Sequence, residues 1–388
     1  MLNGPFSPWP SYTEEEGNAV RDVLLSNKVN YWTGQECREF EHEFADFAES
    51  EYAIAVANGT VALDLALKAL GVGACDEVVV TSRTFLASVS SIVNAGAVPV
   101  FADIDRDSQN ITAESIKAVL SVKTRAIVCV HLAGWPCDMD SIMALADQNG
   151  LFVIEDCAQA HGARYGGRSV GSIGHIGAWS FCQDKIMTTG GEGGMVTTND
   201  KPLWSKMWSL KDHGKSWDAV YEREHPPGFR WLHESFGTNG RMTEMQAIIG
   251  RIQLKRMPKW HETRLRYAQQ IWEAARNLPG LRVPDLSEGI EHGCYKCYLF
   301  VESGNRDDIM QAIVAKGVPC FSGSCSEVYL EKAFDGTGWR PDRPLPVAHE
   351  LGETSLMFLV HPTLTQEEVD KTCQVLKEVV QELHGQPA

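Results

Sequence analysis

The sequence predicts an α/β protein in which helices cover both faces of a mostly parallel sheet. Short β-branched runs alternate with helical segments between residues 50 and 200. Such alternation is typical of βαβ units, whose parallel strands are buried on both faces. The chain has 388 residues, 44% of them hydrophobic and 22% charged, so it has enough material for one large domain and a smaller one.

The expected elements follow from these patterns in order. Strands are expected at 52–57, 77–81, 98–101, 125–130 and 151–154, and helices at 61–70 and 88–95. The second half opens with a long helix, 242–276, which is rich in helix formers and interrupted near Pro258. Antiparallel strands around Tyr298 and Val318 and a closing helix at 366–383 then indicate the smaller C-terminal domain. The segment 216–236 is long, aromatic and charged, which is typical of a functional or mobile loop.

Composition excludes several classes of function. The formal net charge of −16 argues against wholesale binding to nucleic acid or to an anionic membrane. Residues 1–12 have neither a basic nor an apolar signal-peptide region, and no run of 18 apolar residues suggests a membrane span. The eleven cysteines are an odd count scattered through expected strands and helices, which indicates reduced thiols and a cytoplasmic protein.

Four cysteines near the C-terminus loosely resemble a zinc site, namely Cys294, Cys297, Cys320 and Cys325. However, the first two lie in an expected strand, where residues three apart point to opposite faces. The spacing of the second pair is also wrong for a zinc knuckle. We therefore expect buried cysteines and no metal.

Lys185 is the first candidate for catalysis. It follows the apolar run 178–181 and precedes a loop with four glycines, so it lies between a strand end and a loop, where reactive groups are commonly presented. A partly buried lysine loses affinity for its proton and becomes a nucleophile for aldehydes. Lys185 is therefore a candidate Schiff-base residue, with a solvated surface lysine as the alternative.

Asn58-Gly59-Thr60 lies between an expected strand and an expected helix. Free N–H groups at a helix N-terminus, a glycine that permits close approach and a threonine hydroxyl form a phosphate cradle. An ordinary helix cap explains the same residues when they stand alone. The nucleotide-binding motifs GxxxxGK[ST] and GxGxxG are absent in their required context.

Asp156 ends the expected strand at 151–154, at the edge where parallel sheets bind ligands. A metal ligand, a ribose anchor, a partner for a protonated heteroaromatic nitrogen and a helix N-cap all remain open for this residue alone. Together with the phosphate cradle, Phe85 and Lys185, it fits pyridoxal 5′-phosphate (PLP). That cofactor has a phosphate, a flat ring on which Phe85 would stack, a ring nitrogen and an aldehyde.

With these residues, the sequence resembles the DegT/DnrJ/EryC1/StrS family of PLP-dependent sugar aminotransferases over nearly its whole length. The resemblance implies the aspartate aminotransferase fold (fold type I), with a seven-stranded sheet, a large PLP-binding domain at 1–265 and a small α+β domain at 266–388. Residues 1–30 would pack on the small domain. The blocks that carry the resemblance are Pro8-Trp9-Pro10, 58–63, 82–85, 131–136, 155–163, 179–194 and 239–247.

The resemblance also implies roles for individual residues. Lys185 would form the Schiff base with the cofactor and move the proton between cofactor and substrate carbons. Asp156 would pair with the ring nitrogen and Gln159 with the ring hydroxyl. Gly59, Thr60 and Ser180 would hold the phosphate, and Asn239 would reach the phosphate of the neighbouring subunit. Arg241, Glu192 and His131 would contact the substrate, although His131, like His161, also fits a packing role.

The expected activity is transfer of an amino group from an amino acid, L-glutamate, to a nucleotide-linked keto-sugar. The expected position is C4 of a 4-keto-6-deoxyhexose, for cell-surface glycan or natural-product synthesis. Amination at C3, a cyclitol ketone and an aminoshikimate-type substrate remain alternatives on the same fold. The role of Asn239 implies a homodimer with shared active sites. A PLP-binding regulator is the alternative from a different class, which the intact Lys185, Asp156 and Gln159 argue against.

Overall fold

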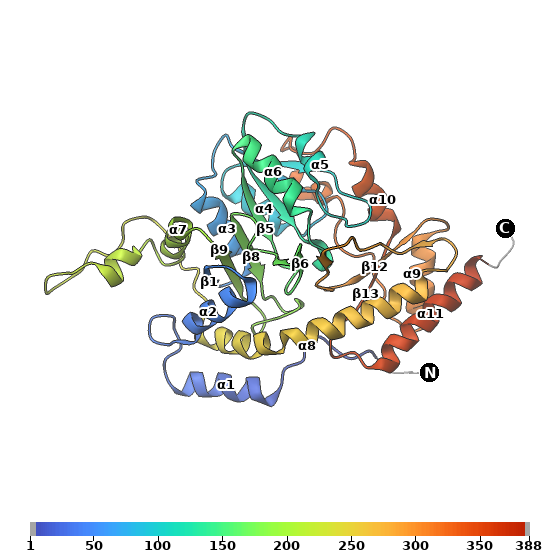
Figure 1. Cartoon of the computed structure of the whole chain (residues 1–388), viewed down its shortest axis with the longest axis horizontal. Helices are drawn as coiled ribbons and strands as arrows, with labels where there is room; N and C mark the ends of the chain where they lie inside the picture. The colour runs from blue at the N-terminus through green and yellow to red at the C-terminus, as the bar shows by residue number, and fades with distance from the viewer. Residues whose placement is uncertain (1–4, 385–388) are drawn as a thin grey trace.

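The computed structural model describes residues 5–384, and its centre is a seven-stranded sheet in the order β1-β9-β8-β5-β4-β2-β3 (Figure 1). Neighbouring strands from β3 to β8 pair in parallel. Both β8 and β1 pair antiparallel with β9, so β1 runs in the same direction as β8 and only β9 is reversed. The mostly parallel α/β sheet is therefore confirmed. The strands are β1 (Tyr52–Val56), β2 (Glu77–Thr81), β3 (Val98–Ala102), β4 (Thr124–Val130), β5 (Phe152–Asp156), β8 (Ile176–Ser180) and β9 (Gly194–Thr198).

Helices cover both faces of this sheet because successive strand residues alternate between the two faces. Val78 and Val80 join one buried cluster with the apolar face of α3, whereas Val79 joins another with Ile116 of α5 and Ile142 of α6. The helices of the first part are α1 (Glu14–Leu25), α2 (Glu36–Ala48), α3 (Gly59–Ala69), α4 (Ala87–Asn94), α5 (Ala113–Lys117), α6 (Met139–Asn149) and α7 (Lys201–Lys211).

A long helix, α8 (Glu244–Ala275), connects this part to a second one. It contacts α1 and α2 near its start and α11 farther along (Figure 1). The second part has its own buried cluster, in which Tyr267 and Ile271 of α8 join a three-stranded antiparallel sheet. Its elements are β10 (Leu281–Arg282), β12 (Cys297–Val301), α9 (Arg306–Ala315), α10 (Pro346–Thr354), β13 (Ser355–Phe358) and α11 (Gln366–His384); a small sheet of β6 (Arg164–Tyr165), β7 (Arg168–Ser169) and β11 (Ile290–Glu291) links the two parts.

The two buried clusters support the division of the chain near residue 265, which remains a proposal. The N-terminal segment reaches the second part, since Thr363 Oγ1 donates a hydrogen bond of 2.7 Å to the carbonyl of Pro8 and Phe6 packs against the same cluster. None of the helices within residues 5–384 is both long and apolar enough to cross a bilayer.

Two expectations are wrong. Val318 is not part of a strand, because Gly317 adopts a φ of 77° and the chain turns there; only Phe321 makes an isolated bridge, to Met357. The helix α8 is not interrupted at Pro258 but continues through it.

The segment 216–236, called the arm below, extends away from the body and contains a short π-helical turn at Asp218–Glu222 (Figure 1).

In the part of the chain that the structure describes, Cys294, Cys297, Cys320 and Cys325 do not form a group of three or more potential metal ligands. Cys294, Cys297 and Cys320 are buried and Cys325 is exposed, and all eleven cysteines of the chain are free thiols. Within residues 5–384, the group that does bring three potential metal ligands together is His131, Glu155 and Cys157. The Glu155 carboxylate of this group already accepts hydrogen bonds from the backbone N–H groups of Gly171 and Gly174.

We predict opposite effects of alanine at two helical glycines. A Cβ at Gly250 in α8 would lie 2.5 Å from Cζ of Phe40 in α2, whereas a Cβ at Gly17 in α1 would meet nothing within 4 Å. Gly250→Ala should destabilise the protein by about 1–3 kcal/mol through overpacking. Gly17→Ala should stabilise it by about 0.4–1 kcal/mol. Thermal unfolding followed by circular dichroism measures both, and equal midpoints for the two variants would contradict this account of α2–α8 packing.

Candidate active site

A cavity of about 1070 Å³ lies at the carboxyl edge of the sheet. Strands β1, β2, β4, β5 and β8 all run toward this edge, which is where open α/β sheets bind ligands. Residues of the second part, among them Tyr295 and Lys296, form another wall. Of the predicted site residues, the cavity is lined by Gly59, Thr60, Phe85, Asp156, Gln159, Ser180, Lys185 and Glu192.

The turn between β1 and α3 has the form of a phosphate cradle. Asn58 is the N-cap, and its Oδ1 accepts a hydrogen bond of 3.0 Å from Val61 N. The helix begins at Gly59, earlier than expected, so the N–H groups of Gly59 and Thr60 lie in its first turn and have no intrahelical partner. A Cβ on Gly59 would lie 2.7 Å from Cβ of Ser180, so only glycine lets the helix end approach β8 this closely.

Asp156 is buried at the end of β5 with its carboxylate held from two directions. Ser88 Oγ donates to Oδ2 at 2.8 Å, and the backbone N–H of Ala158 donates to Oδ1 at 3.1 Å. Burial raises the pKa of Asp156, and these hydrogen bonds together with the charge of Lys185 offset the rise only in part. A cationic partner such as a pyridinium N–H would favour the ionised form.

Gln159 and Phe85 present the remaining groups that a pyridine ring needs. Gln159 Oε1 accepts a hydrogen bond of 2.8 Å from Ala133 N, which leaves the amide nitrogen as the donor toward the cavity. Phe85 lines the cavity with 71% of its surface exposed, so a ring face is available for stacking.

Lys185 lies on the loop between β8 and β9. Its backbone is fixed because Trp9 Nε1 donates a hydrogen bond of 2.8 Å to its carbonyl. Its Nζ is 3.8 Å from Asp184 Oδ1 and 5.4 Å from the ring centroid of Tyr295, and its side chain is mostly buried. The Tyr295 hydroxyl in turn donates to Asp184, so a carboxylate and an aromatic ring together position the amine.

The structure does not bring three of the predicted residues to this cavity. His131 is fully buried, where its Nε2 donates to Glu155 at 3.0 Å and its Nδ1 accepts from Cys137 N at 3.0 Å. This is the packing role left open by the sequence. Asn239 is exposed, and its backbone bridges to that of Asp212. Arg241 Nη1 donates a hydrogen bond of 2.6 Å to the carboxylate of Asp212. Neither Asn239 nor Arg241 lines this cavity.

Sequence reasoning missed several residues of the site. Ser88 lies four residues after Thr84, and the two hydroxyls are 2.8 Å apart. The i, i+4 spacing of these hydroxyl residues on either side of Phe85 could have indicated Ser88. Asp184 adjoins Lys185, but nothing local shows that it holds the amine. Tyr295 and Lys296 come from the second part of the chain, and their only signal was the CxxC motif that surrounds them.

The residues of the cavity fit PLP at every part of the molecule. The cradle that a Cβ on Gly59 would close suits the phosphate, and the buried Asp156 suits the ring nitrogen. The model of the DegT/DnrJ/EryC1/StrS aminotransferase family matches residues 10–377. The chain belongs to this family. It is a PLP-dependent aminotransferase of fold type I.

Individual relatives agree with this assignment over at least 95% of their length. The aminotransferase is 66% identical to one from Psychrobacter cryohalolentis of known structure, with a TM-score of 0.96, and the match covers 98% of this chain and 100% of that one. It is 34% identical to a GDP-perosamine synthase of Escherichia coli O157:H7, over 95% of this chain and 96% of the relative. A UDP-N-acetyl-3-dehydro-alpha-D-glucosamine 3-aminotransferase of Acidithiobacillus ferrooxidans is 35% identical, over 94% and 95% respectively.

We predict that Gly59→Ala weakens cofactor binding while the fold is retained. The added methyl group would push the N-terminus of α3 away from Ser180, so the N–H groups of the first turn would lose their place at the phosphate. The dissociation constant of PLP should rise by about tenfold or more, consistent with loss of one or two charge-assisted hydrogen bonds.

Titration of the apoprotein with PLP, followed by absorbance, measures this constant. Gly73→Ala is the matched control, since its Cβ would meet only Ala95 O at 3.8 Å. Equal PLP affinity for wild type and Gly59→Ala would contradict the assignment of the cradle.

Proposed function

We propose that this aminotransferase transfers the amino group of L-glutamate to C4 of a nucleotide-linked 4-keto-6-deoxyhexose, for cell-surface glycan or natural-product synthesis. The observation that carries the proposal is the full-length likeness to a GDP-perosamine synthase and a UDP-sugar 3-aminotransferase. The cavity of about 1070 Å³ supports it, because its volume is in the upper range of small-molecule sites and suits a cofactor together with a large substrate.

The residues of the cavity have defined tasks in this reaction. PLP, when bound, supplies an electron-withdrawing ring that stabilises negative charge on the carbon next to the transferred nitrogen. Lys185 Nζ would take the proton from the α-carbon of the donor and deliver it to the cofactor carbon in the first half-reaction. In the second half-reaction it would move a proton from that cofactor carbon to the sugar carbon that receives the nitrogen. Asp184 and Tyr295 hold that amine in place between the two transfers.

Position C3 is the second candidate, since the UDP-sugar relative is named a 3-aminotransferase. A cyclitol ketone or an aminoshikimate-type ketone would need the same residues. A regulator that only binds PLP is disfavoured because Lys185, Asp156 and Gln159 all line the cavity.

We place the enzyme in the cytoplasm, which the eleven free thiols support.

We predict that the purified enzyme converts a nucleotide-linked 4-keto-6-deoxyhexose to its 4-amino sugar with L-glutamate. Mass spectrometry and NMR of the products from a panel of 4-keto sugars, 3-keto sugars and cyclitol ketones identify the substrate. Lys185→Ala should keep the fold and lose turnover, because the variant lacks the amine that moves the proton beside Asp184. Turnover of that variant near the wild-type rate would contradict the mechanism, and exclusive amination of 3-keto sugars would contradict the position.

A dimer with shared sites is the second part of the proposal. Asn239 is exposed and does not line its own cavity, so its amide is available to the phosphate of a neighbouring subunit. The arm leads directly into this region and exposes Phe229, Trp231 and Phe236. Large exposed aromatic side chains on one segment are typical of a surface that another protein covers.

We predict that two inactive variants complement each other. Lys185→Ala removes the amine of one site, and Asn239→Asp places a negative charge at the phosphate of the other subunit's site. A dimer with one chain of each kind contains one intact site and one doubly altered site, so coexpression with random pairing should restore about a quarter of wild-type turnover. Activity no higher than that of the separate variants, or a fully active monomer in sedimentation, would contradict sharing.

A further inference from the structure

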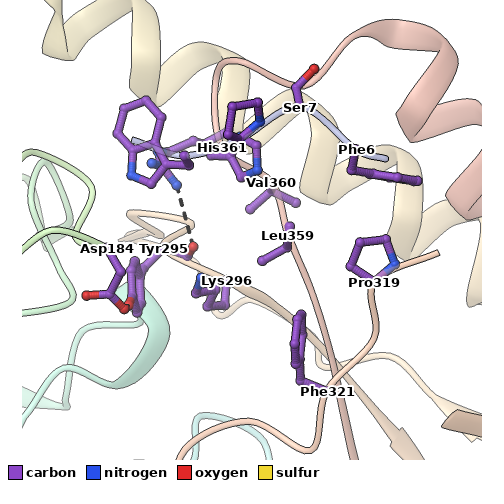
Figure 2. Close-up of a pocket in the computed structure, with 13 residues that line it drawn as sticks. Phe6, Ser7, Asp184, Tyr295, Lys296, Pro319, Phe321, Leu359, Val360 and His361 are labelled. Atoms are coloured by element: carbon purple, nitrogen blue, oxygen red, sulfur yellow. Dashed lines mark hydrogen bonds between the residues drawn. The ribbon is translucent and has the colours of Figure 1, made fainter. Parts of the chain in front are cut away.

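A second cavity of about 310 Å³ adjoins the first (Figure 2). Its lining includes the N-terminal segment at 6–9, Phe321 and residues 359–361. Five residues line both cavities, namely Asp184, Tyr295, Lys296, Phe321 and Leu359. The second cavity is therefore a side chamber of the active site, and none of the roles described so far uses it.

Arg264 of α8 lines this chamber with a guanidinium that is largely unsatisfied. The residue is only 1% exposed, and its Nη1 donates a long hydrogen bond of 3.5 Å to Tyr295 O. Its Nε and Nη2 have no hydrogen-bond partner among the described residues. The guanidinium lies 5.1 Å from the ring centroid of Trp9, which covers one face. Buried, unpaired cationic donors are costly, so an anionic ligand would relieve a cost that the protein otherwise carries.

The other titratable groups make the chamber cationic. Burial, with a contribution from the charge of Arg264, lowers the pKa of Lys296 to about 8. Burial and the same two cations lower the pKa of His361 to about 3, so its ring is uncharged at neutral pH. Asp184 is the one acidic side chain that lines the chamber, and it is already engaged by the Tyr295 hydroxyl and faces Lys185.

The chamber also lies in the right place for one end of an amino acid. The ring of Tyr295 is 5.4 Å from Lys185 Nζ, and the carbonyl of the same residue is the partner of Arg264. A donor amino acid must bring its nitrogen to the position of Lys185. The second carboxylate of glutamate lies two methylene groups beyond its α-carbon, and Phe6, Leu359 and Val360 offer an apolar surface to such methylene groups.

We propose that Arg264 and Lys296 bind the side-chain carboxylate of the amino donor, so that this chamber selects a dicarboxylic amino acid. The inference deepens the proposed function and rests on it for the identity of the reaction. The planar fork of an arginine matches a carboxylate in a bidentate manner, while a lysine supplies a point charge. A monocarboxylic amino acid would leave both cations without a partner.

The direct test is binding of two inert acids to the PLP-loaded enzyme by isothermal titration calorimetry. Glutarate carries two carboxylates, and pentanoate has the same number of carbons but only one. Wild type should bind glutarate at least tenfold more tightly than pentanoate. Lys296→Met should lower the affinity for glutarate by about tenfold and leave that for pentanoate unchanged, as should Arg264→Lys if it folds. Lys123→Met, at an exposed lysine, is the control that should change neither affinity.

A second measurement separates this inference from the proposed function. Stopped-flow absorbance follows the conversion of the bound cofactor by the amino donor alone, without any sugar. Lys296→Met should raise the apparent KM for L-glutamate about tenfold and leave that for L-alanine unchanged. Equal affinity of wild type for the two acids, or equal losses with both amino acids, would overturn the donor chamber. Selective glutarate binding in an enzyme that aminates no keto-sugar would overturn the proposed sugar substrate but uphold the chamber.

Discussion

The buried carboxylate of Glu155 fixes the geometry on which the active site depends. It accepts hydrogen bonds from His131 Nε2 at 3.0 Å and from the backbone of Gly171 and Gly174 at 2.8 and 2.6 Å. Burial acts to raise the pKa of Glu155, but these hydrogen bonds outweigh it and lower the pKa. One carboxylate thus connects the end of β4, the strand β5 and the loop that enters β8. Because side chains alternate along a strand, Asp156 then points to the side opposite from Glu155, toward the cavity.

The reversed strand β9 brings the lysine and the phosphate cradle together. A Cβ on Gly194, the first residue of β9, would lie 2.6 Å from the carbonyl of Asn58, so β9 passes directly against the cradle. At the other side, Phe181 N donates to Gly193 O at 2.8 Å and closes the loop that carries Lys185. The amine therefore lies above the strand ends because both ends of its loop are fixed to the sheet. The Trp9 indole adds a third attachment, at the carbonyl of Lys185.

The sequence predicts this site where the chemistry is local and fails where it depends on tertiary contacts. Asp156 and the cradle at Gly59 follow directly after apolar strands, and the strand–turn pattern identifies both. The strand β9 carries no such signal, because it begins at the last of four loop glycines and owes its place to pairing with β1 and β8. His131 shows the converse case. Its position at a strand end suggests a ligand, but a buried carboxylate on the neighbouring strand makes it a packing residue.

Arg264 and Arg266 show why the donor chamber is invisible in the sequence. They lie two residues apart in α8, in a segment of charged residues that reads as a solvated helix face. Two positions along a helix correspond to nearly opposite directions, so the structure buries Arg264 beneath Trp9 and leaves Arg266 exposed. Trp9 of the N-terminal segment covers the guanidinium of Arg264, and Tyr295, just before the strand β12, offers it a carbonyl. A cationic chamber next to Lys185 thus results from three segments that are distant in sequence, each unremarkable alone.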